Sequence, residues 1–222
     1  MYVDFMSSNH KQQKRDYLAR VNDPIFPKAK AAELAKKFEF DYWDGDRRIN
    51  YGGYKYIEGR WTPIAKKMIE FYKLNNTSKI LDVGCGKGFL LYELKKLLPG
   101  ASINGLDRSQ YAIENSKDEI RKDLIQGCAS KLPYNDNSFD LAISINTLHC
   151  LENFKLSNAL SELERVSAKD KYVCVESFRN EVEKANLLYW QVTCEMFCTP
   201  QAWEWWFSKV GYTGDHSYIF FE

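Results

Sequence analysis

The sequence predicts an open, doubly wound α/β sandwich, in which a parallel sheet carries helices on both faces. Between residues 61 and 175, short apolar runs alternate at least four times with stretches that carry apolar residues at helical spacing. The short runs are continuously apolar, which is typical of parallel strands covered on both sides. Because ligands of such sheets bind beyond the carboxyl ends of the strands, we expect the functional residues in the loops that follow the strands.

Composition limits the classes of protein that this chain can be. Its 222 residues are 45% hydrophobic, enough for one core without disulfides or a structural metal. With 31 basic and 30 acidic residues, the chain lacks the basic excess of a dedicated nucleic-acid binder. It has no apolar run of the roughly 18 residues that span a bilayer, and its start does not resemble a signal peptide. The six cysteines are scattered and the three histidines lie far apart, which predicts reduced thiols, no metal site and a cytoplasmic location.

Residues 1–60 are expected to form an N-terminal arm and a cap, or lid, ahead of the sheet domain. Residues 1–20 are polar and basic, and two prolines interrupt the segment that follows. A short helix is predicted over residues 28–38. Residues 40–61 contain too many turn residues for a long helix and too many aromatic residues for a linker.

The sheet domain is expected over residues 61–222. Helical spacing predicts helices over residues 61–74, 88–98, 109–120, 156–166, a region ending near 193, and 200–210. Apolar runs predict strands over residues 79–83, 102–106, 124–127, 139–145 and 172–175, with one or two more within 212–221.

The most informative motif is the turn after the first predicted strand, ILDVGCGKG at residues 80–88. The strand leads into Gly84, Gly86 and Gly88 and then into a helix; glycine permits tight turns and close approach of a ligand to the backbone. About 19 residues later Asp107 ends the next strand, where an acid can accept both hydroxyls of a ribose. The spacing is neither the G-x-G-x-x-G fingerprint nor a P-loop. It favours a ligand that carries a nucleoside but no cradled phosphate.

With Asp82 inside the motif and Asp107 at the next strand end, residues 61–175 resemble class I S-adenosylmethionine-dependent methyltransferases. The resemblance implies a Rossmann-like, mostly parallel sheet of seven strands. Its last hairpin should be short, since only about ten residues follow the final helix. The resemblance also implies that the chain binds S-adenosyl-L-methionine and releases S-adenosyl-L-homocysteine.

The family suggests where each part of the cofactor binds. The three glycines would line its methionine and ribose parts, Asp82 would lie near its amino-acid end, and Arg108 would flank the adenine. Many relatives carry an acid where this chain has Cys128, so the backbone near Cys128 and Ala129 is expected to hold the adenine; a plain buried thiol is the alternative. The residues expected to bind the cofactor are Asp82, Gly84, Cys85, Gly86, Gly88, Asp107, Arg108, Cys128, Ala129, Asn146, Tyr51 and Tyr54.

Two residues are candidates for the catalytic chemistry. His149 follows the fourth strand in a loop that lies beside the transferred methyl in this family, and its usual pKa of about 6.5 suits a general base. Alternatively, it stacks on the cofactor or caps the next helix. Glu176 follows the fifth strand as a base or as a ligand for an amine or hydroxyl. The alternative is a satisfied polar group at a strand end.

Three residues are expected to contact the substrate: Arg60, Tyr56 and Arg179. Arginines would favour a phosphate or carboxylate on the substrate, and tyrosines of the cap could lie over a sulfonium. Alternatively, the cap is a packed extension and Arg179 a solvated loop charge.

We predict an enzyme of the EC 2.1.1 type that methylates a small molecule. The N-terminal block also resembles uncharacterised bacterial methyltransferases of surface-polysaccharide pathways. That favours an oxygen of a sugar, nucleotide-linked or phosphoryl (including phosphoramidate) intermediate of capsule or lipopolysaccharide synthesis. The alternative is an RNA or protein methyltransferase that docks through the basic stretches 11–20 and 28–37. A regulator without catalysis is disfavoured by the intact glycine turn. The sequence predicts no membrane insertion and no nucleic-acid partner, and it permits a homodimer.

Overall fold

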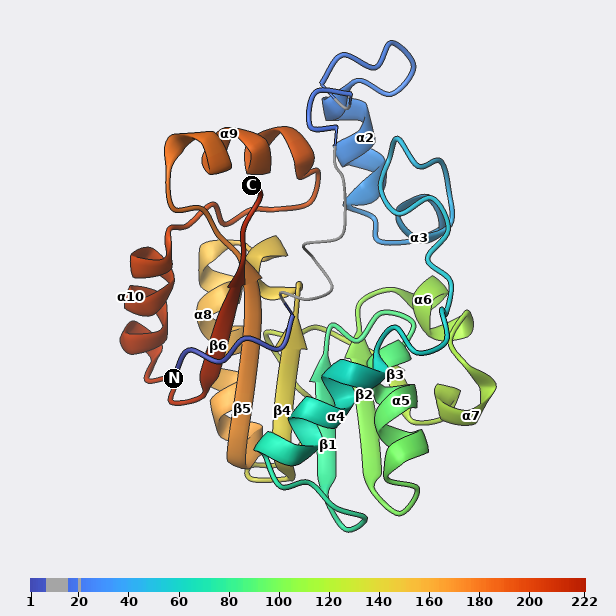
Figure 1. Cartoon of the computed structure of the whole chain (residues 1–222), viewed down its shortest axis with the longest axis vertical. Coiled ribbons are helices and arrows are strands. Elements are labelled where there is room, and N and C mark those ends of the chain that lie inside the picture. Colours follow the sequence, from blue (N-terminus) through green and yellow to red (C-terminus); the bar gives the residue numbers. More distant parts are fainter. Residues whose placement is uncertain (7–15, 20) are drawn as a thin grey trace.

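The computed structural model describes residues 1–6, 16–19 and 21–222. Its centre is a six-stranded parallel sheet in the order β3-β2-β1-β4-β5-β6, with helices on both faces (Figure 1). This confirms the doubly wound α/β fold. The basic stretch 11–20, expected as a docking arm in the alternative function, lies outside the described residues except for 16–19.

The elements follow one another as the periodicity predicts. The strands are β1 (Lys79–Val83), β2 (Ser102–Asp107), β3 (Leu124–Gln126), β4 (Phe139–Ile145), β5 (Ser167–Glu176) and β6 (Asp215–Ile219). The helices are α2 (Lys28–Ala35), α3 (Phe40–Trp43), α4 (Thr62–Phe71), α5 (Phe89–Leu97), α6 (Gln110–Glu114), α7 (Asp118–Arg121), η1 (Leu148–Cys150), α8 (Asn153–Val166), α9 (Glu181–Trp190) and α10 (Pro200–Val210). None of the helices in the described part of the chain is both long and apolar enough to cross a bilayer.

Alternate residues of each strand face opposite sides of the sheet, so the core has two halves. The half that includes α4 and α5 buries Ile80, Ile103, Leu141, Ile143 and Tyr172 of the strands. The half that includes α8 and α10 buries Leu81, Leu106, Ala142, Val173 and Val175. Because helices cover both faces, the central residues of β1, β4 and β5 are buried on both sides of the sheet.

The sheet has one strand fewer than expected. Over residues 212–221 the structure has a single strand, β6, which runs parallel to β5 with Tyr172 opposite Asp215. The described residues contain no antiparallel seventh strand. The left-handed Gly211 ends α10, and β6 follows over Asp215–Ile219. At the outer edge of β6, the backbone of Val3 donates to the carbonyl of His216 at 2.8 Å.

Two other elements differ from the prediction. The helix predicted over residues 109–120 is broken into α6 and α7 at residues 115–117. Strand β5 begins at Ser167, five residues before the predicted start. The prediction missed these residues because they are mostly polar, are partly exposed and carry no apolar pattern.

The cap stands beyond the carboxyl ends of the strands. In Figure 1, α2 and α3 lie above one half of the sheet and α9 lies above the other half. Ala35, Tyr42 and Trp43 form a small core of the cap that continues onto Ala112 and Val192 of the sheet domain. The cap therefore packs directly against the elements that surround the strand ends.

We expect Gly88→Ala to destabilise the protein more than Gly211→Ala. Both glycines have left-handed backbones, with φ of 69° and 70°, so each substitution costs roughly 1–2 kcal/mol of backbone strain. Only at Gly88 would the new Cβ meet a neighbour, Ile120 Cδ1 at 2.7 Å, which adds about 1–3 kcal/mol of overpacking. Urea unfolding of the two variants measures the difference. Equal losses of unfolding free energy in the two variants would show that Ile120 moves away from the new Cβ at no cost.

Candidate functional site

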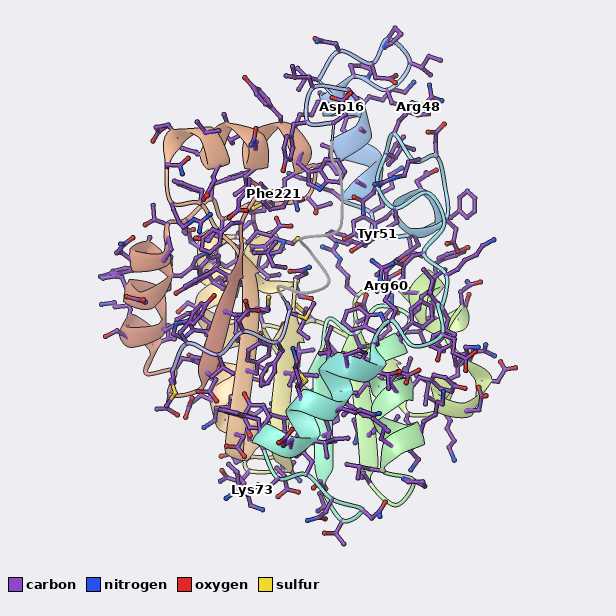
Figure 2. All side chains as sticks on the ribbon, in the orientation of Figure 1. Asp16, Arg48, Tyr51, Arg60, Lys73 and Phe221 are labelled. Carbon is purple, nitrogen blue, oxygen red and sulfur yellow. The ribbon has the colours of Figure 1, made fainter. Side chains whose placement is uncertain are left out.

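A cavity of about 840 Å³ lies between the cap and the carboxyl ends of the strands. Its walls come from the cap, from the loops after β1, β2, β3, β4 and β5, and from the segment after α9. In Figure 2, Tyr51 and Arg60 are labelled on the cap side of this region and Phe221 on the side of β6. The volume falls within the roughly 300–1,000 Å³ of small-molecule sites.

Each glycine of the turn after β1 lacks a side chain for a different reason. A Cβ on Gly84 would lie 2.0 Å from Thr147 Oγ1, so this glycine lets the loops after β1 and β4 touch. A Cβ on Gly86 would lie 2.6 Å from the Trp43 ring of the cap. Gly88 packs against Ile120 and does not line the cavity. The glycines thus permit close packing within the protein as well as the approach of a ligand.

Asp107, at the end of β2, is a buried acceptor at the cavity wall. Its Oδ2 accepts from the backbone of Gly86 at 2.7 Å, and its Oδ1 accepts from the backbone of Ser109 at 2.8 Å. Burial raises the pKa of this carboxyl although the two N–H donors oppose the rise. Each oxygen retains a second lone pair, so both can accept hydroxyl protons from a ligand.

Two further side chains at the strand ends carry buried oxygens. Among the described residues, Asp82 Oδ1 and Asn146 Oδ1 have no hydrogen-bond partner. Burial, together with the nearby Asp107, raises the pKa of Asp82 to about 8. Asn146 also has a left-handed backbone, with φ of 55°, and such strain in a non-glycine residue is typical of functional sites. These two oxygens form an unsatisfied acceptor site for a cation or a hydrogen-bond donor.

His149 and Glu176 lie together at the opposite wall. The backbone N–H of Glu176 donates to His149 Nδ1 at 3.3 Å, and His149 Nε2 lies 3.4 Å from Glu176 Oε2. Both ring nitrogens therefore face groups of Glu176. Burial lowers the pKa of His149 to about 3, so the ring is neutral. The amide of Gln191 donates to the Glu176 carboxylate from the other side.

The cap contributes an aromatic wall. Trp43 stacks on Tyr51 with ring centroids 5.5 Å apart, and Tyr54 stacks on Phe89 at 5.2 Å. The indole N–H of Trp43 lies 3.0 Å from Ser109 Oγ, which holds the ring over the glycine turn. Such π-faces suit a flat ring or a cationic centre.

Polar contacts fasten the cap on both sides of the cavity. On the glycine-turn side, Lys87 Nζ lies 2.6 Å from Asp44 Oδ2, which also accepts from Tyr111 at 2.8 Å. On the side of the segment after α9, Lys36 lies 2.6 Å from Glu195. Lys87 is only 4% exposed, so this ion pair is shielded from solvent.

Fourteen of the residues singled out from the sequence line this cavity. They are Asp82, Gly84, Cys85, Gly86, Asp107, Arg108, Cys128, Ala129, Asn146, Tyr51, Tyr54, Arg60, His149 and Glu176. Their roles in binding and catalysis remain predictions.

Two residues expected to contact substrate lie elsewhere. Arg179 donates to Glu183 and Glu222, and its guanidinium lies 4.2 Å from the Phe220 ring centroid, outside the cavity lining. Its carboxylate partners hold it against the end of β6. Tyr56 donates its hydroxyl to the buried Glu93 and is likewise outside the lining.

Some cavity residues and one ion pair could not be foreseen from the sequence. Thr193, after α9, and Phe221, after β6, reach the cavity from segments far apart in the sequence, and no local pattern indicated them. The link between Lys87 and Asp44 spans 43 residues. The one feature of the sequence that could have indicated this pair is the position of Lys87, a charged residue within the glycine turn before a buried helix.

The residues around the cavity fit S-adenosylmethionine. Asp107 could accept the ribose hydroxyls, and the unpartnered oxygens of Asp82 and Asn146 could accept an ammonium group. The aromatic wall could face a sulfonium. Among the described residues, no group of three His, Cys, Asp or Glu side chains is arranged to hold a metal ion.

Relatives in sequence carry the same kind of domain. The chain is 32% identical over 120 residues to an uncharacterised methyltransferase of Schizosaccharomyces pombe, covering 48% of this chain and 41% of that protein. It is 35% identical over 91 residues to the phthiotriol/phenolphthiotriol dimycocerosates methyltransferase of Mycobacterium tuberculosis, covering 40% of this chain and 33% of that protein. The matched region thus spans less than half of either relative.

A solved structure shows the same fold at lower identity. The YcgJ protein of Bacillus subtilis superposes with a TM-score of 0.54 at 20% identity, over 66% of each chain. The family model described as "Methyltransferase domain" matches residues 74–211, which include every strand of the sheet except β6. With more than half of its length matched, the chain belongs to the methyltransferase-domain family.

Proposed function

We propose that the protein transfers a methyl group from S-adenosylmethionine to an oxygen of a small polar molecule, with Glu176 as general base. The observation that carries this proposal is the buried Glu176 carboxylate at the cavity wall, held by His149 on one side and by the Gln191 amide on the other. The methyltransferase domain supports the reaction class.

Three groups of residues would hold the cofactor. Asp107 would bind the ribose, and Asp82 with Asn146 would bind the amino-acid end. Arg108, Cys128 and Ala129, at the ends of β2 and β3, would surround the adenine. When bound, the cofactor supplies a methyl group activated on a cationic sulfur, so the protein has only to orient the acceptor and remove its proton.

Glu176 fits the role of base better than His149. Because His149 Nδ1 accepts from the Glu176 backbone, its neutral ring carries the proton on Nε2, which faces the Glu176 carboxylate. A ring in this state has no free lone pair with which to take the proton from the hydroxyl of the substrate. His149 therefore acts as a positioning residue, and the carboxylate, with two lone pairs on each oxygen, receives the proton.

The cavity supports a small acceptor. Its volume suits a small ligand, and the cap covers the strand ends with polar links on both sides. An RNA or protein acceptor would require the cap to move away. Arg60 at the cavity wall suits an acceptor with a phosphate or carboxylate, and we propose surface-polysaccharide precursors as the first class to assay.

The test is transfer of label from methyl-labelled S-adenosylmethionine to an extract of the source organism, separated into small molecules, RNA and protein. We expect label in the small-molecule fraction. We also expect Glu176→Gln to lower turnover by about 10²–10⁴-fold, the usual contribution of a general base. The matched control is Glu164→Gln, an acid bonded to Thr213 and Lys171 outside the cavity lining. Label in RNA or protein alone, or full activity in Glu176→Gln, would contradict the proposal.

Asp107→Asn should weaken binding of S-adenosylhomocysteine by about 10- to 100-fold, as expected from the loss of charge-assisted hydrogen bonds worth about 1.5–3 kcal/mol. Titration calorimetry measures the affinity. The control is Asp140→Asn in β4, where the carboxylate accepts from the Lys79 backbone at the start of β1. If both variants bind equally well, Asp107 is not the ribose acceptor.

Binding of S-adenosylhomocysteine should release a proton near pH 7. The free protein keeps Asp82 protonated below about pH 8, whereas an ammonium group beside it favours the carboxylate. Affinity should therefore rise by up to about tenfold per pH unit as the pH approaches 8 and level off above it. Calorimetry in buffers of different ionisation enthalpy counts the proton. In Asp82→Asn the release should vanish, and a wild type that releases none would refute the assignment.

A further inference from the structure

A second, smaller pocket of about 200 Å³ borders the cap on the side of α6 and α7. It shares Tyr54, Lys55 and Phe89 with the large cavity, so residues 54–55 of the cap separate the two spaces. The remaining lining is Tyr56, Lys87, Asn115, Ser116 and Lys117. Asp107 and Glu176, the proposed ribose acceptor and general base, do not line this pocket.

The described residues of this lining carry charge of one sign only, since they include three lysines and no carboxylate. Lys87 has a partner, since its ammonium is paired with Asp44. Among the described residues, neither Lys55 nor Lys117 forms an ion pair with a carboxylate. The Lys117 ammonium lies 4.5 Å from the Tyr56 ring centroid and 5.4 Å from that of Tyr92, which keeps the charge at the wall of the pocket.

The same lining contains a buried hydroxyl. Ser116 is 7% exposed, and its Oγ has no hydrogen-bond partner in the part of the chain that the structure describes. A buried donor without an acceptor is unfavourable unless a ligand or water completes it. The hydroxyl belongs to the break between α6 and α7, beside Lys117. An unsatisfied donor and two uncompensated cations therefore share one pocket.

We propose that this pocket binds a small oxyanion of the phosphate type. Lys55 and Lys117 would supply positive charge and Ser116 a hydroxyl donor, and a dianion with several acceptor oxygens satisfies all three at once. Because Lys55 belongs to the cap while Ser116 and Lys117 belong to the sheet domain, the anion would link the two parts. This inference does not rest on the proposed methyl transfer.

Titration calorimetry of the full chain with inorganic phosphate, at constant ionic strength and pH 7.5, tests the proposal. We expect saturable binding that weakens about tenfold or more in Lys117→Gln, the scale of one lost charge-assisted hydrogen bond. Lys55→Gln should weaken it similarly and Ser116→Ala to a smaller extent. Lys122→Gln is the matched control, an exposed lysine outside the pocket lining, and it should bind phosphate as the wild type does.

A further variant and a second ligand keep the outcomes distinct. Arg60→Gln alters only the large cavity. If it abolishes phosphate binding while Lys117→Gln does not, the anion binds in the large cavity and the proposal is wrong. No saturation in the wild type would also overturn it. In Lys117→Gln and Ser116→Ala, whose residues line only the small pocket, the affinity for S-adenosylhomocysteine should stay unchanged, so failure of the anion site is separable from failure of the proposed function.

The same titration separates two sources of the phosphate. A phosphate monoester that binds only the protein loaded with S-adenosylhomocysteine would assign the anion to the acceptor molecule. Inorganic phosphate that binds the free and the loaded protein alike would assign it to a free ion.

Discussion

The carboxylate of Asp107 is the contact on which the geometry of the site depends. It joins the turn after β1, through the Gly86 N–H, to the start of α6, through the Ser109 N–H. Ser109 in turn caps α6, where its Oγ accepts from the Ala112 backbone, and lies within hydrogen-bond distance of the Trp43 indole of the cap. One buried acid thus determines how the glycine turn, the second strand end and the cap lie relative to one another. Two backbone donors offset part of the cost of burying it.

On the other side of the cavity, the wall is built from the end of β5 and the segment after α9. The carbonyl of Glu176 accepts from the Trp203 indole of α10, and the carbonyl of His149 accepts from Glu195 and Met196. These bonds fix the backbones that carry Glu176 and His149 before any ligand arrives. A carboxylate held in this way keeps its direction without help from the substrate, which is the usual requirement of a preorganised site.

Most of the sheet domain could be predicted from the sequence because its strands are buried on both faces and its helices are amphipathic. Residues 79–83 and 139–145 match β1 and β4 at both ends. The start of β5 could not be predicted, since Lys169 and Asp170 are charged and interrupt any apolar pattern, and this part of the strand pairs with β4. Around the cavity, Asp82 and Asp107 follow from the motif. The hydrogen bond from Gln191 to Glu176 depends on where the end of α9 lies in the folded chain. No local sequence pattern encodes that position.

The two ion pairs that hold the cap, Lys36–Glu195 and Lys87–Asp44, differ in their exposure to solvent. Lys36 and Glu195 are well exposed, with side-chain exposures of 47% and 36%, so dissolved salt weakens their attraction. Lys87 and Asp44 are shielded, and separating them would strand a buried charge. Raising the ionic strength should therefore weaken the contact of the cap with the segment after α9 more than its contact at the glycine turn.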